Sequence, residues 1–185
     1  MYKRQRVEAT ALYSGIVVDT KNFAVQTGVR TFDAAAYLRR SGADPVMVRH
    51  LFRTDYETTV ALAKAEARSE FYEGGLIVST CPELISNGQV IAAQVADSLL
   101  RIENVRMSIV VFQLTEDTVG ISARSTGELS VQVIMEAFGG GGHQNVAGAQ
   151  VKGGDVEDIK QQAIEIAKKY IEENDQDESN LTAGR

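Results

Sequence analysis

The segment MSIVVFQLTEDTVGISARS (Met107–Ser125) decides the fold of the second half of the chain. It is rich in the β-branched and apolar residues that strands favour, and it is interrupted once by polar residues. The pattern predicts two strands, Met107–Leu114 and Thr118–Ser125, joined by a turn at Thr115–Asp117. An antiparallel strand pair is therefore the first element that we expect.

The second of these strands carries an unusual polar face. Because side chains alternate along a strand, Ser122 and Arg124 share one face with Gly120, and the apolar residues between them point to the other. A guanidinium binds phosphate through paired donors, and one charge-assisted hydrogen bond contributes about 1.5–3 kcal/mol. The alternative is an Arg at a strand end that pairs with a nearby carboxylate, and the sequence leaves both interpretations open.

A glycine run with a histidine, Gly139–His143, follows a predicted short helix, Val131–Phe138, whose end Gly139 would cap. Four consecutive glycines cost conformational entropy on ordering, so a purely structural turn would need fewer. Glycine also lets successive backbone N–H groups point into one concavity, which suits phosphate. The alternative is a flexible linker or helix cap, with His143 in solvent.

The surrounding sequence predicts an α/β domain. A strand is expected at Leu76–Val78, an amphipathic helix at Gln89–Ile102, a strand at Ala147–Lys152 and a final helix that Asp155 caps. The predicted boundaries are residues 1–54 for a helical first part, 55–73 for a linker helix, 74–173 for the α/β domain, and 174–185 for a disordered acidic tail.

One carboxylate in the first part is a candidate metal ligand. Asp19 follows Leu12 by seven residues and Ile16 by three, so helical periodicity places it on their apolar stripe. It also lies near the helix C-terminus, where the helix dipole disfavours a negative charge. Asp19 would then need a cation, unless the helix ends earlier and Asp19 bonds to its own turn.

Composition restricts the function classes. The 185 residues are 44% hydrophobic and 24% charged, which is typical of globular proteins, and the formal net charge is −6. This charge argues against a broad, nonspecific grip on extended nucleic acid. Cys81 is the single cysteine, which fits a cytoplasmic setting, and neither a membrane span nor a signal peptide is expected.

Four segments resemble the DHH/DHHA1 phosphoesterase superfamily, and in particular the C-terminal part of GdpP-type cyclic-di-AMP phosphodiesterases. They are Ala9–Phe23, Thr27–Asp44, SARS at Ser122–Ser125 and GGGGH at Gly139–His143. The resemblance implies that the first two segments end a DHH domain. It implies that the last two belong to a DHHA1 domain with a mixed β-sheet flanked by helices.

The resemblance also implies roles for individual residues. Asp19 would be a catalytic residue and a ligand of one of two manganese ions, which together generate the attacking hydroxide. Arg124 and Ser122 would hold a substrate phosphate. The residues that would cradle phosphate or nucleotide are Gly140, Gly141, Gly142 and His143. The implied reaction is hydrolysis of cyclic-di-AMP to linear pApA.

The sequence departs from this family upstream. The remaining metal-ligand motifs, including the Asp-His-His signature, are absent, so we expect an incomplete manganese site and no activity from this chain alone. The implied partner is a cyclic dinucleotide or short oligonucleotide, with a possible homodimer. The parent protein is expected to be anchored to the bacterial membrane. The alternatives are an oligoribonuclease or pAp phosphatase of the same superfamily, or a non-catalytic DHHA1-type module that binds nucleic acid.

Overall fold

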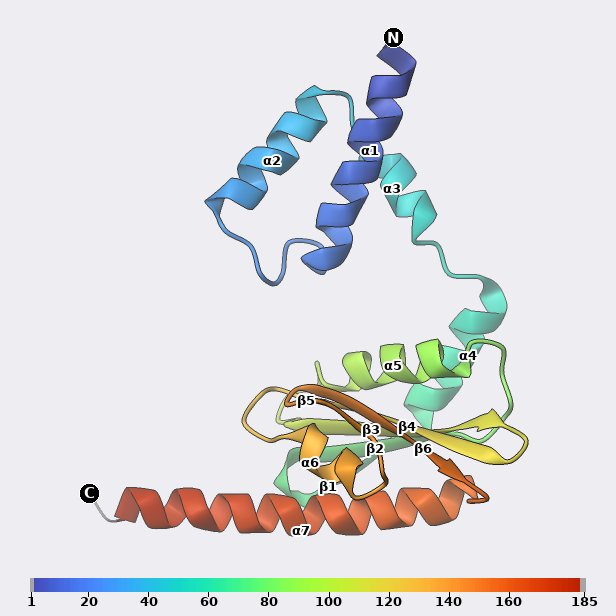
Figure 1. The fold of residues 1–185 in the computed structure, drawn as a ribbon, viewed down its shortest axis with the longest axis vertical. Helices are drawn as coiled ribbons and strands as arrows, with labels where there is room; N and C mark the ends of the chain where they lie inside the picture. Colours follow the sequence, from blue (N-terminus) through green and yellow to red (C-terminus); the bar gives the residue numbers. More distant parts are fainter. Residues whose placement is uncertain (1, 184–185) are drawn as a thin grey trace. The chain divides into compact units, whose positions relative to one another are not determined.

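The structure, a computed structural model, describes the backbone of residues 2–183 and the side chains of residues 5–176 (Figure 1). The chain divides into two units, Met1–Asp55 and Tyr56–Arg185, and each is described by itself. Within the described residues, no helix has the length and apolar character needed to cross a membrane.

The first unit consists of three helices around a small core. They are α1 (Tyr2–Asp19), α2 (Val29–Arg40) and α3 (Pro45–Leu51). The start of α3 follows from local chemistry, because the Asp44 carboxylate accepts hydrogen bonds from the N–H groups of Val46 and Met47. The core cluster of this unit contains the buried residues Ala9, Leu38 and Ala43, and Ala35 and Val48 are also buried. This core is small for a unit of this length.

The second unit is a six-stranded sheet with helices on both faces. Its elements are α4 (Tyr56–Ala67), β1 (Glu70–Tyr72), the 3-10 turn η1 (Glu73–Gly75), β2 (Leu76–Cys81), α5 (Gly88–Leu99), β3 (Met107–Thr115), β4 (Thr118–Ser125), α6 (Val131–Glu136), β5 (Gly141–His143), β6 (Val146–Lys152) and α7 (Val156–Ala183). The strand order is β1-β2-β3-β4-β6-β5. Only β2 and β3 pair in parallel; the other neighbours are antiparallel. This mixed sheet confirms the predicted fold class.

The alternation of β3 and β4 creates two separate cores. One face of the sheet packs against α6 and α7, with Ile109, Ile121 and Ala163 among the buried residues. The other face packs against α4 and α5, with Val110 and Phe112 contributed by β3. In Figure 1, α7 and α5 lie on opposite sides of the sheet. The predicted division of the β4 faces is therefore confirmed, with Ser122 and Arg124 on the α5 side.

Two predicted boundaries were wrong. The expected linker helix 55–73 ends at Ala67, and Glu70–Tyr72 forms β1, which pairs antiparallel with β2. Gly74 and Gly75 reverse the chain between the two strands, and both have positive φ angles that favour glycine. The predicted disordered tail, 174–185, is helical up to Ala183, because no Gly or Pro interrupts α7 there; residues 184 and 185 lie outside the described residues.

Candidate functional site

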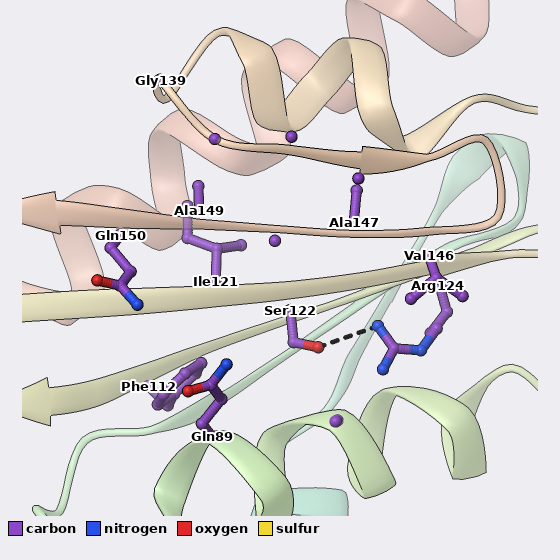
Figure 2. Close-up of a pocket in the computed structure, with 15 residues that line it drawn as sticks. Gln89, Phe112, Ile121, Ser122, Arg124, Gly139, Val146, Ala147, Ala149 and Gln150 are labelled. Carbon is purple, nitrogen blue, oxygen red and sulfur yellow. Dashed lines mark hydrogen bonds between the residues drawn. The ribbon is translucent and has the colours of Figure 1, made fainter.

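A pocket of about 580 Å³ lies over β4, β5 and β6, beside α5 (Figure 2). Its lining residues are Gln89, Ala93, Phe112, Ile121, Ser122, Arg124, Gly139, Gly140, Gly141, Gly142, Val146, Ala147, Gly148, Ala149 and Gln150. Figure 2 places Gln89 and Gln150 toward one end of the pocket and Arg124 toward the other, with Ser122 between them. Residues of both sequence motifs, the polar face of β4 and the glycine run, thus line the same pocket.

The position of β4 in the sheet makes the floor of this pocket rigid. Ser122 pairs with Val110 of β3 on one side and with Gly148 of β6 on the other, so its backbone is held from both directions. Gly148 has no side chain, and a methyl group there would lie 2.9 Å from the Ile121 carbonyl oxygen, so β4 and β6 approach closely at this point. Helix α5 packs against β3 and β4 and supplies Ala93 as part of the wall.

The Arg124 guanidinium has three partners, one carboxylate in an ion pair and two hydrogen-bond acceptors. Its Nε lies 3.3 Å from Oδ1 of Asp97 on α5. Its Nη1 donates to the Ala123 carbonyl at 2.9 Å and to the Ser122 hydroxyl at 3.2 Å. The side chain is only 12% exposed. Arg124 thus has the carboxylate partner of the alternative interpretation and also lines a pocket, and its role in binding phosphate stays a prediction.

The remaining donors at this end of the pocket suit an anion. A guanidinium has five N–H groups, and the hydrogen bonds that Arg124 donates to described residues come from Nη1. The Ser122 hydroxyl accepts from Nη1, so its own proton remains available to donate. Up to three donors therefore remain for the non-bridging oxygens of a phosphate group.

The glycine run is partly a strand, which corrects the prediction of a loop. Gly139 N–H donates to the Glu136 carbonyl and Gly140 N–H to the Met135 carbonyl, which is the Schellman arrangement that ends a helix. The next residues form edge strand β5, in which Gly141 pairs with Gly148 and His143 with Val146. The backbone N–H groups thus follow an edge strand and do not converge as a free loop would.

Close packing explains why two of these positions are glycine. A methyl group at Gly140 would lie 2.3 Å from the Gly148 carbonyl oxygen, and one at Gly142 would lie 2.5 Å from the Val146 carbonyl oxygen. Gly141 differs, because a methyl group there meets no atom within 4 Å, and its φ angle is not in the region that favours glycine. Its side-chain position faces open space at the pocket, which leaves room for a ligand.

The other predicted site residues lie elsewhere. His143 is exposed on β5 and does not line the pocket. Asp19 is the last residue of α1, in the first unit, and it is exposed, as is Leu12 at 64%. Of the predicted apolar stripe, Ile16 packs against the small core of this unit, whereas Leu12 and Asp19 do not. Its role as a metal ligand stays a prediction.

The described residues do not form a metal centre. No group of three or more His, Cys, Asp or Glu side chains gathers anywhere in the part of the chain that the structure describes. One carboxylate at Asp19 is too few donors for a two-ion site, so the residues present do not fit the manganese pair that the resemblance implies.

Sequence reasoning missed several residues of this pocket. Gln89 and Gln150 bring side-chain amides that can both donate and accept hydrogen bonds. Phe112 packs its ring against Gly120, its partner on β4, where no larger residue fits. Asp97 appears in the sequence as an ordinary polar residue on an amphipathic helix. Only the packing of α5 on β4 reveals its contact with Arg124.

Comparisons with known proteins agree with this architecture. Residues 73–173 match the family described as DHHA1 domain. The chain is 45% identical over 165 residues to the cyclic-di-AMP phosphodiesterase PdeA of Listeria monocytogenes, covering 89% of this chain and 25% of that protein. It is 46% identical over 170 residues to the cyclic-di-AMP phosphodiesterase GdpP of Geobacillus thermodenitrificans, covering 92% and 26%. The chain thus spans about a quarter of the length of these relatives.

A solved structure shares the fold. The crystal structure of an exopolyphosphatase-related protein from Bacteroides fragilis covers 89% of this chain with a TM-score of 0.74 and 20% sequence identity. The match covers 49% of that protein. At this level of identity, the likeness concerns the fold alone.

Proposed function

Because this chain belongs to the DHHA1 domain family, we propose that it is the substrate-binding part of a phosphodiesterase that hydrolyses cyclic-di-AMP to pApA. Two cyclic-di-AMP phosphodiesterases are 45% and 46% identical to it. The similarity extends beyond residues 73–173, since it covers 89% and 92% of the chain. This extent supports a substrate like that of these relatives.

The geometry of Arg124 carries the proposal. A guanidinium that is largely buried, paired with Asp97 at Nε and hydrogen-bonded to the protein through Nη1 is arranged to offer its Nη2 donors to an anion. The Ser122 hydroxyl adds a further donor beside it. Since a ligand phosphate meets groups already in place, little side-chain entropy is lost on binding.

In the proposed reaction, this chain binds and orients the dinucleotide. Arg124 and Ser122 would hold one phosphate of the dinucleotide, and β5 would border it along the glycine run. The amides of Gln89 and Gln150, toward the other end of the pocket, could hydrogen-bond a nucleobase. A fixed phosphate converts attack on it into an oriented, effectively unimolecular step. The described residues do not form a manganese site, so the role proposed for them is confined to binding and orientation.

Binding of cyclic-di-AMP to the purified chain tests the proposal. Isothermal titration calorimetry is expected to show binding by the wild type and a loss of at least about tenfold in affinity for Arg124→Ala, since a charge-assisted hydrogen bond is removed. Arg101→Ala is the matched control, because it removes the same charge from an exposed residue outside the pocket. Equal affinity of Arg124→Ala and the wild type would refute the proposed site.

Activity requires more than this chain supplies. We expect no manganese-dependent hydrolysis of cyclic-di-AMP by residues 1–185 alone, measured by chromatographic detection of pApA. Measurable turnover would contradict this expectation. In a longer protein that contains the chain, a panel of cyclic-di-AMP, pApA and pAp would separate the proposed substrate from those of the oligoribonuclease and pAp phosphatase alternatives.

A further inference from the structure

A carboxylate accompanies the cation of the pocket. Asp97 lies on α5, one helical turn after the pocket-lining Ala93, and its Oδ1 is 3.3 Å from Nε of Arg124. The Asp97 side chain is 36% exposed and that of Arg124 is 12% exposed. Partial burial of this kind weakens the screening of the two charges by salt.

The contact fixes the plane of the guanidinium. Asp97 Oδ1 lies 3.3 Å from Nε as an ion-pair partner, while Ala123 and Ser122 accept hydrogen bonds from Nη1, so Arg124 has protein partners at two of its three nitrogens. The donors on Nη2 are consequently the ones presented to the pocket. A planar guanidinium with partners at Nε and Nη1 cannot turn its remaining donors away without breaking these contacts.

The contact also sets the charge that a ligand meets. Among the pocket-lining residues, all of which the structure describes, Arg124 alone carries a formal charge. The formal charges of Arg124 and Asp97 sum to zero. A phosphodiester carries one negative charge, whereas a phosphomonoester carries about −1.5 to −2 at pH 7. The second charge of a monoester is repelled by Asp97 and meets no additional cation in this lining.

We propose that Asp97 is a positioning residue for Arg124 and that its charge makes the pocket favour monoanionic phosphodiesters over dianionic phosphomonoesters. The inference rests on the proposed function and narrows its substrate class: internal diester phosphates, as in a cyclic dinucleotide, suit this pocket better than terminal phosphates. The carboxylate thereby favours the substrate of a diesterase over its phosphomonoester products.

Two probes that differ by one charge test the inference directly. They are adenosine 5′-monophosphate and its 5′-methyl phosphate ester, titrated calorimetrically into the 185-residue chain at pH 8. The quantity of interest is the ratio of the monophosphate Kd to the methyl ester Kd. This ratio cancels any equal weakening of both ligands by a less well-held Arg124.

The charge of Asp97 predicts a definite change in this ratio. We expect Asp97→Asn to lower it by about tenfold, because one repulsive charge a few ångströms from the ligand is removed. Asp97→Glu restores the charge and is expected to return the ratio toward that of the wild type. Asp97→Ser serves as a second neutral variant should the Asn variant fold poorly, with folding checked by circular dichroism.

The control and the opposing outcomes are distinct. Glu172→Gln removes the same charge from an exposed site on α7, on the opposite face of the sheet, and should leave the ratio unchanged. A ratio that stays the same in Asp97→Asn and Asp97→Ser overturns the inference. If Arg124→Ala abolishes binding of both probes in that case, the proposed binding site still stands; if Arg124→Ala binds both normally, the site itself is refuted.

Discussion

Single residues in the glycine run serve different purposes. Gly140 and Gly142 are glycine because carbonyl oxygens of β6 approach too closely for a side chain, and Gly139 takes the left-handed conformation that ends α6. Gly141 has neither reason. Its lack of a side chain is explained by the space that it leaves in the pocket.

Alanine at two adjacent positions should therefore give opposite results. Gly140→Ala is expected to destabilise the fold by about 1–3 kcal/mol, because the new methyl group overlaps Gly148 and Ala149. Gly141→Ala should leave stability unchanged or raise it by up to about 1 kcal/mol, yet weaken cyclic-di-AMP binding. Urea denaturation and calorimetric titration measure the two effects. Normal ligand affinity in Gly141→Ala would show that the pocket space at this position is not used.

The single cysteine should be unreactive. Cys81 is 3% exposed, and burial, with a smaller contribution from Glu83, raises the pKa of its thiol from 9.0 to about 11. A shift of this size lowers the thiolate fraction at neutral pH by about 100-fold. We expect alkylation by iodoacetamide to be slower than that of a small free thiol by at least this factor, and to become fast in urea. Rapid modification of the folded protein would contradict this.

Some of the pocket residues follow from local sequence, and others depend on tertiary packing. Arg124 and Ser122 could be placed on one face of a strand because alternation is a local property. Asp97 could not be identified, since its contact depends on how α5 packs across β4. His143 was grouped with the glycines by adjacency, but its pairing with Val146 on β5 leaves it exposed and outside the pocket.

Elements with a strong periodic pattern were predicted closely. The expected strands Met107–Leu114 and Thr118–Ser125 are observed as β3, Met107–Thr115, and β4, Thr118–Ser125. The strands that were missed, β1 and β5, have three residues each, which is too short for a period to be visible. β5 is also rich in glycine, which disfavours strands, and only its hairpin with β6 makes it one.

An ion pair beside α4 gives this part of the fold a pH dependence. Arg68 donates to both carboxylate oxygens of Glu83, at 2.7 and 2.5 Å, and this hydrogen bonding lowers the pKa of Glu83 to about 2. Because the folded pKa lies below the ordinary value of 4.5, the pair stabilises the fold above about pH 4.5. That contribution is lost as the pH falls toward 2.

The substitution Glu83→Gln should remove this dependence. Both side chains are more than a third exposed, so screening limits the expected loss at pH 7 to about 0.2–1 kcal/mol. Urea denaturation at pH 7 and pH 3 should show the difference between wild type and variant shrinking at the lower pH. A difference that is the same at both values would argue against the assigned role of the pair.

The whole molecule combines a large folding unit with a small one. Both extensive hydrophobic cores lie within Tyr56–Arg185, whereas the core cluster of the first unit contains, among its described residues, three buried ones, Ala9, Leu38 and Ala43. Many large apolar side chains of the first unit are exposed, including Val29 at 79% and Phe32 at 53%. A small core supplies little stability in isolation.

Separate expression of the two units should show that they differ in stability. Residues 56–185 expressed alone are expected to unfold in one cooperative transition and to retain the pocket, because every pocket-lining residue lies within them. Residues 1–55 alone should show no cooperative transition. Thermal unfolding followed by circular dichroism distinguishes the two, and an unfolded 56–185 fragment would contradict the prediction.

Strand β4 lies between two neighbours and β5 lies at the sheet edge. This difference predicts different rates of amide hydrogen exchange in the two strands. Amide protons of Ser122 and Arg124 sit in the middle of the sheet and should exchange with solvent deuterium only through large-scale opening of the fold. Those of Gly141 and Gly142, in a three-residue edge strand, should exchange orders of magnitude faster. The pocket is therefore bordered by β4, whose amides exchange slowly, and by β5, whose amides exchange fast. A bound ligand is expected to slow amide exchange measurably in β5 alone.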